Sequence, residues 1–125
     1  MTNRRILVVD DDRDVVQFLA GLLRKAGYTP ILAMDAMQAM MQAQREVPDL
    51  ILTDISMPAG GGLTFLERVN RSGKTSHIPV LVLTGSDEPD LESRALANGA
   101  VRVLRKPCDN AVLLAAIRAA LREEG

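Results

Sequence analysis

Five polar side chains stand at or just beyond the ends of short apolar runs: Asp10, Asp11, Asp54, Thr84 and Lys106. If the runs are neighbouring strands, the three carboxylates meet with an excess of negative charge. Two like charges about 4 Å apart repel by about 4 kcal/mol at an effective dielectric constant of about 20. A divalent cation would relieve this repulsion, and hard oxygen ligands suit Mg²⁺, with Mn²⁺ able to substitute. The pattern therefore indicates a carboxylate site for Mg²⁺.

Asp54 is the most conspicuous of these residues because it ends the apolar run 50–53 and precedes a turn. Pro58 and the glycines at 60–62 follow it closely. A single acid at the tip of a buried strand, followed by a flexible turn, indicates a carboxylate that is presented for chemistry. We therefore expect Asp54 to be the centre of the site.

The bulk composition limits the classes of protein. The chain has 125 residues, 47% hydrophobic and 25% charged, with a formal net charge of −1. This predicts one globular domain over residues 1–125, with no effector domain in this chain and no global basic field for nucleic acid or membrane. Cys108 is the one cysteine, which fits a reducing cytoplasm, and with His77 alone zinc is disfavoured. No apolar run has the ~18 residues of a membrane span.

Five apolar runs alternate with helical patterns along the chain. The predicted strands are residues 6–9, 28–32, 50–53, 79–83 and 101–104. The predicted helices follow them: 12–27, 35–46, one around 63–69, 88–98 and 111–122. Asp12, Asp35 and Asp109 are the expected N-caps. We also expect the methionines of the second helix to fill the core: Met34, Met37, Met40 and Met41.

This alternation predicts an α/β fold, a doubly wound (βα)5 flavodoxin-like sandwich with a parallel sheet. The first, third and fourth runs are uninterrupted and should be central. Pro30 and Arg102 mark the second and fifth runs as edges. The expected strand order is therefore 2-1-3-4-5, which places the site at the carboxyl ends of the strands, at the switch point between the first and the third.

Over nearly its whole length the chain resembles the receiver domains of two-component response regulators. The matching segments are Val-Val-Asp10-Asp11, Leu-Thr-Asp54-Ile-Ser-Met-Pro58, Val-Leu-Thr84-Gly85 and Arg-Lys106-Pro107, in order and in spacing. The resemblance implies a phosphoacceptor switch and not an enzyme in the ordinary sense, although it can assist its own phosphorylation and dephosphorylation.

The resemblance also implies a role for each residue of the site. Asp54 would accept a phosphoryl group, and Asp10, Asp11, Asp54 and the backbone carbonyl of Ser56 would bind Mg²⁺. Lys106 would contact a phosphoryl oxygen, and Thr84, followed by Gly85, would bond another. The Lys106–Pro107 peptide is a candidate for the cis form. Metal, lysine and hydroxyl would together stabilise the three equatorial oxygens of the transferred group.

The chain departs from the family where phosphorylation is usually reported. Receivers commonly carry an aromatic residue three positions before the lysine, and here that position is Val103. Cys108 stands where a phenylalanine is frequent. Ser56 and Ser86, each two residues beyond a site residue, occupy positions that in this family tune the phosphoryl lifetime. We expect intact acceptor chemistry with a different read-out.

The resemblance implies a sensor histidine kinase or a histidine phosphotransfer protein as donor. A downstream protein, or a second copy of the chain, would bind the face formed by the fourth helix, the fifth strand and the fifth helix. The chain can be a natural single-domain regulator, a piece of a longer regulator or the receiver of a hybrid kinase.

Two alternatives stay open. In a phosphatase of the haloacid-dehalogenase type, Asp10 would be the nucleophile and Asp12 the acid or base, which leaves Asp54 without a function. A receiver-like scaffold would bind proteins without being phosphorylated. Asp12 has a simpler interpretation as a helix cap.

Overall fold

The computed structural model describes residues 3–55 and 61–123, which form five strands and five helices in strict alternation. The strands are β1 (Arg5–Val9), β2 (Thr29–Ala33), β3 (Leu50–Thr53), β4 (Val80–Thr84) and β5 (Arg102–Arg105). The helices are α1 (Arg13–Lys25), α2 (Ala36–Glu46), α3 (Gly61–Arg71), α4 (Leu91–Ala97) and α5 (Asn110–Ala120).

All four strand pairings are parallel, and the sheet has the order β2-β1-β3-β4-β5. The predicted doubly wound fold and its strand order are therefore confirmed. The three central strands are buried along their length or nearly so, whereas β2 and β5 lie at the edges and are partly exposed. Pro30 and Arg102, the residues that predicted the edges, lie in those two strands.

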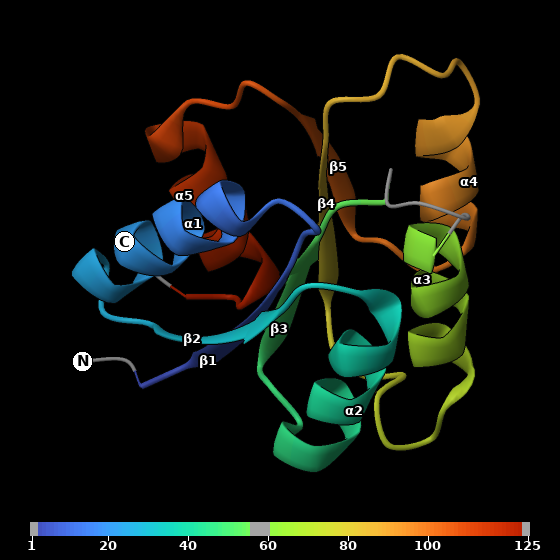
Figure 1. Ribbon diagram of the computed structural model, residues 1–125, viewed down its shortest axis with the longest axis horizontal. Helices are drawn as coiled ribbons and strands as arrows, with labels where there is room; N and C mark the ends of the chain where they lie inside the picture. The colour runs from blue at the N-terminus through green and yellow to red at the C-terminus, as the bar shows by residue number, and fades with distance from the viewer. Residues whose placement is uncertain (1–2, 56–60, 124–125) are drawn as a thin grey trace.

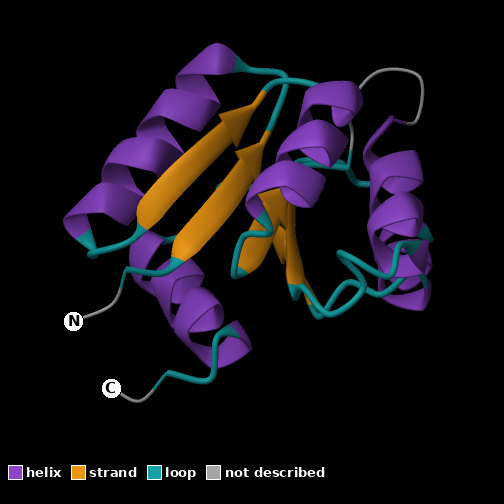
Figure 2. Cartoon of the chain, turned by 90° about the horizontal axis from the view of Figure 1, so that it is seen from below, coloured by secondary structure: helices purple, strands orange, loops and turns teal. Residues whose placement is uncertain are grey.

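Helices cover both faces of the sheet (Figure 1). One core contains residues of α2, α3 and α4, and the other contains residues of α1 and α5. Figure 2 shows the strands running between these two layers, with loops at both ends. Because all strands are parallel, their carboxyl ends lie at the same end of the sheet. The polar side chains gather at this rim.

Aspartate N-caps fix the start of three helices, α1, α2 and α5. Asp12 caps α1, and its carboxylate accepts hydrogen bonds from the backbone N–H groups of Asp14 and Val15. Asp35 caps α2, and Asp109 caps α5. The predicted N-caps are confirmed, and the interpretation of Asp12 as a cap is confirmed with them.

Two sequence-based expectations need correction. α4 covers seven residues and is shorter than the predicted 88–98, because residues 85–90 form a loop whose Ser86 side chain accepts a hydrogen bond from Glu88 N. The core role of the methionines holds for Met40, which is buried, but is wrong for Met37 and Met41, which are 75% and 60% exposed. These two lie on the side of α2 that faces away from the sheet.

Within the described ranges, none of the helices has the length and apolarity that crossing a membrane requires.

Candidate functional site

Backbone hydrogen bonds place the ends of four strands side by side. Asp54 N donates to Val9 O at 3.0 Å, which fixes the end of β3 against the end of β1. Lys106 N donates to Thr84 O at 2.8 Å, which fixes the residue after β5 against the end of β4. The polar side chains that follow these strands therefore lie at one rim of the sheet.

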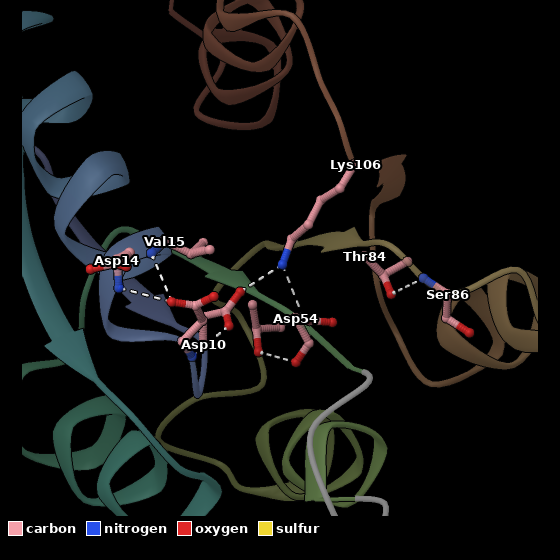
Figure 3. Close-up of polar contacts among 9 residues, drawn as sticks. Asp10, Asp14, Val15, Asp54, Thr84, Ser86 and Lys106 are labelled. Carbon is pink, nitrogen blue, oxygen red and sulfur yellow. Dashed lines mark hydrogen bonds and ion pairs between the residues drawn. The ribbon is translucent and has the colours of Figure 1, made fainter.

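Lys106 joins the two buried carboxylates of this rim. Its Nζ lies 2.7 Å from Asp10 Oδ2 and 3.1 Å from Asp54 Oδ2 (Figure 3). Asp10 is 3% exposed and Asp54 7%. Two buried carboxylates with one ammonium leave an excess negative charge in a poorly solvated place, and a second cation would stabilise it.

The pKa of Lys106 reflects this neighbourhood. Burial alone disfavours the ammonium and lowers its pKa, but the hydrogen bonds to Asp10 and Asp54, together with their charges, outweigh it. The net result is a pKa above the ordinary value of 10.5. Lys106 therefore carries its charge throughout the physiological range.

Asp10 has a second, structural contact besides its bond to Lys106. Its Oδ1 accepts a hydrogen bond from Asp12 N at 3.0 Å, which shapes the turn into α1. Asp11, between them, is exposed to solvent. Of the three predicted carboxylates, the structure brings Asp10 and Asp54 together with Lys106, and it leaves Asp11 at the open side of the site.

The hydroxyl of Thr84 belongs to the same rim. Thr84 is buried, and its Oγ1 accepts a hydrogen bond from Ser86 N at 3.1 Å. Gly85 between them is exposed, and a Cβ there would meet only Lys106 Cβ at an ordinary 3.9 Å. Thr84 is thus bonded to the loop that follows β4 (Figure 3).

The Lys106–Pro107 peptide is cis, as expected. Val103, the aliphatic residue at the position where receivers carry an aromatic one, is half-buried and packs against the core under α2, α3 and α4. Arg105 was not singled out from the sequence. It donates a hydrogen bond to Ser86 O and lies 3.9 Å from Glu92 of α4.

The donor set fits Mg²⁺. Asp10 and Asp54 offer hard carboxylate oxygens at a site with excess negative charge, and Mg²⁺ is typically bound by one or two carboxylates together with waters and phosphate oxygens. Over the residues that the structure describes, no three His, Cys, Asp or Glu side chains form a metal cluster by themselves. Ser56, whose carbonyl was expected to contribute, lies outside the described residues.

An apolar groove adjoins the site on the α1 and α5 side. It has a volume of about 390 Å³, and its lining includes Phe18, Leu83, Lys106, Pro107 and Leu113. Phe18 is 60% exposed, which is unusual for so large an aromatic side chain. The groove thus offers an apolar contact surface next to the lysine of the site.

A doubly wound sheet with buried carboxylates, a threonine and a lysine at its carboxyl rim is typical of a class of signalling domains that respond to their own phosphorylation. The chain belongs to the response regulator receiver domain family, whose model matches residues 6–118. It is therefore the receiver of a two-component response regulator, and receivers in general are phosphoacceptor switches that use Mg²⁺ and interact with histidine kinases and downstream effectors.

Relatives and solved structures agree with this assignment. The chain is 36% identical to the phosphate regulon transcriptional regulatory protein PhoB of Escherichia coli, over 95% of this chain and 52% of PhoB. It is 37% identical to the response regulator PleD of Caulobacter vibrioides, over 94% of this chain and 26% of PleD. The chain thus spans about half of PhoB and a quarter of PleD.

Among solved structures, the chemotaxis response regulator CheY4 of Vibrio cholerae matches with a TM-score of 0.87 and 30% identity, covering 95% of this chain and 99% of CheY4. A CheY-like receiver domain protein of Methanospirillum hungatei matches with a TM-score of 0.90 and 26% identity, covering 97% and 95%.

Proposed function

We propose that residues 1–125 form one receiver domain in which Asp54 accepts a phosphoryl group from a phosphohistidine donor, in a Mg²⁺-dependent reaction. The observation that carries this proposal is the position of Lys106 Nζ, 3.1 Å from Asp54 Oδ2 at the end of a buried strand. A new P–O bond forms to the Asp54 carboxylate while the donor's P–N bond breaks, and its electron pair stays on the imidazole nitrogen.

The other site residues bind and orient the group. The ammonium of Lys106 is held within reach of Asp54 by its bond to Asp10, so it can pair with a phosphoryl oxygen without large movement. The hydroxyl of Thr84 can turn toward a second oxygen. Bound Mg²⁺, held by Asp10, Asp54, the exposed Asp11 and the Ser56 carbonyl, would neutralise charge on the transferred group.

The phosphatase alternative is disfavoured by the contacts of Asp12. That carboxylate is exposed and accepts the N–H groups of Asp14 and Val15 as a helix cap, so it is committed to α1 and not to proton transfer. Asp10, the nucleophile of that alternative, is committed to Lys106 and to Asp12 N.

Intact-mass spectrometry after incubation with acetyl phosphate and Mg²⁺ tests the acceptor. We expect one base-labile phosphoryl adduct in the wild type and in the control Asp87→Asn, which alters an exposed carboxylate, and none in Asp54→Ala. No adduct in the wild type, where a known receiver is labelled, would favour a scaffold that binds proteins without phosphorylation. Phosphate release that depends on Asp10 and survives in Asp54→Ala would favour the phosphatase.

The proposed donor is a sensor histidine kinase or a histidine phosphotransfer protein that docks over the Phe18 groove. A donor helix laid there would bury an exposed aromatic ring and bring its histidine beside Lys106 and Asp54. Phe18→Ala is expected to slow transfer from a phosphotransfer protein and to leave labelling by acetyl phosphate unchanged. Equal slowing with both donors would contradict docking at this groove.

The proposed output surface is the face formed by α4, β5 and α5, which binds a downstream protein or a second copy of the chain. Leu96, Val101 and Val112 are exposed apolar residues on or beside these elements. Sedimentation with and without beryllofluoride, which stands in for the phosphoryl group, would detect a second copy.

We propose the cytoplasm as the compartment of this receiver, and we propose neither nucleic acid nor membrane as a direct partner.

A further inference from the structure

Arg105 and Lys106 are neighbours at the end of β5, but their side chains reach different parts of the site. Lys106 binds the two buried carboxylates. Arg105 crosses to the loop between β4 and α4, where its Nη1 donates to Ser86 O, and its Nη2 lies 3.9 Å from Glu92 Oε1 in the first turn of α4. One dipeptide therefore contacts both the acceptor and the loop above it.

Ser86 is held from both sides. Its N–H donates to Thr84 Oγ1 at 3.1 Å, and its carbonyl accepts from the Arg105 guanidinium. In Figure 3 the bond from the Thr84 hydroxyl runs toward Ser86 and away from Asp54. The position of the Thr84 hydroxyl thus depends on a loop residue that Arg105 fixes in place.

The other end of this chain of contacts is α4. This helix has seven residues, and its N-cap, Asp90, makes no side-chain capping bond. A helix start without a cap is weakly fixed, so the ion pair between Arg105 and Glu92 bears on where the first turn of α4 lies. Both side chains are about half exposed, so the pair is weak by itself and sensitive to salt.

We propose that Arg105 is a positioning residue that latches the β4–α4 loop through Ser86 and couples the Thr84 hydroxyl to α4 through Glu92. This rests on the proposed function, because a phosphoryl group on Asp54 is what would draw the Thr84 hydroxyl away from Ser86. When that hydroxyl turns, the N–H of Ser86 loses its acceptor, the loop is held less tightly, and the Arg105–Glu92 contact transmits the change to α4. Such a device works without an aromatic side chain at Val103.

The latch opposes the turning of Thr84, so its removal makes binding at Asp54 easier. Arg105→Ala is therefore expected to bind beryllofluoride about three- to tenfold more tightly than the wild type. Arg105→Lys keeps the charge but lacks the planar fork that reaches Ser86 and Glu92 together, so it should lie between the two. Glu92→Gln removes the ion pair alone and should give a smaller effect than Arg105→Ala. Arg102→Ala removes the same charge from the same strand, at its far end, and is the matched control.

A second measurement examines the latch without any phosphoryl analogue. Hydrogen exchange at the Ser86 amide, followed by NMR in the metal-free protein, should be about three- to tenfold faster in Arg105→Ala and unchanged in Arg102→Ala. If Ser86 exchange is unaffected, or if Arg105→Ala binds beryllofluoride no more tightly than Arg102→Ala, the latch is wrong. If the wild type binds no beryllofluoride while Ser86 exchange responds as expected, the latch stands and the proposed acceptor function fails.

Discussion

Lys106 Nζ donates a 2.7 Å hydrogen bond to Asp10 Oδ2, which ties the residue after β5 to the residue after β1 across the rim of the sheet. The same ammonium reaches Asp54 at 3.1 Å. It thus neutralises part of the charge of two buried carboxylates, and it remains directed at the proposed acceptor. The same ammonium therefore serves both the stability of the fold and the proposed phosphoryl transfer, and variants of these three residues can separate the two roles.

Lys106→Ala should lower the free energy of unfolding by about 1–3 kcal/mol in the absence of Mg²⁺, because two buried carboxylates lose the ammonium that binds them both. Mg²⁺ should still bind and should recover much of the loss, while the conformational response to beryllofluoride is impaired. Urea unfolding with and without Mg²⁺ measures this, with Lys74→Ala as an exposed-lysine control. Loss of Mg²⁺ binding would contradict the role given to Lys106.

Asp54→Ala and Asp10→Ala should differ in stability although both remove one carboxylate from Lys106. Without Asp54, Lys106 and Asp10 remain as a neutral pair, so we expect a change within about 1 kcal/mol. Without Asp10, the N–H of Asp12 also loses its acceptor at the turn into α1, and the loss should be about 1–3 kcal/mol. Urea unfolding at neutral pH in metal-free buffer compares them. A large loss in Asp54→Ala would indicate a structural role for Asp54.

Elements of the fold could be predicted from the sequence where local residue patterns determine them. Residues 50–53 were predicted and found as β3 with the same bounds, because a short apolar run between turn residues has few other interpretations. The strands β4 and β5 each end one residue later than predicted, since the parallel ladder pairs Thr84 with Arg105. The pairing of two strands depends on tertiary structure, so it cannot be read from either strand's own sequence.

The same distinction applies to the site. Asp10, Asp54, Thr84 and Lys106 could be found because each ends or directly follows a strand, and parallel strands end at one rim. Arg105 could not, because its partner Ser86 lies in a loop, and no spacing rule states where that loop lies. The methionines show the same limit, since helical periodicity separates two faces of α2 but does not say which one meets the sheet.

Alkaline pH should destabilise the fold between about pH 10 and 12. Burial, and then the hydrogen bond from Tyr28 Oη to Glu123, raise the pKa of Tyr28 from 10.0 to about 12, and the pKa of Lys106 is also raised. A group with a higher pKa in the folded than in the unfolded protein stabilises the fold fully below its ordinary pKa. That contribution is lost as the pH rises through the folded value.

Tyr28→Phe separates the two groups. The variant should lose about 1 kcal/mol at neutral pH, since the bond to Glu123 is gone, and should show a shallower decline above pH 10. Unfolding free energies measured by urea titration across the alkaline range give both quantities. An unchanged alkaline profile would show that Tyr28 does not contribute to it.

Two glycines should respond oppositely to substitution by alanine. Gly62, in the first turn of α3, packs so closely on Ile55 that a Cβ would overlap with the Ile55 backbone. Because backbone cannot move aside as a flexible side chain can, Gly62→Ala should cost about 2–3 kcal/mol and shift the segment that follows Asp54. Gly21 lies in the exposed part of α1 with open space around it, so Gly21→Ala should stabilise the protein by about 0.5–1 kcal/mol through helix propensity.

Thermal unfolding of the two variants checks both signs. Labelling by acetyl phosphate should fall only in Gly62→Ala, because Ile55 directly follows the proposed acceptor. Equal labelling in the two variants would mean that the close packing of α3 on Ile55 does not position Asp54.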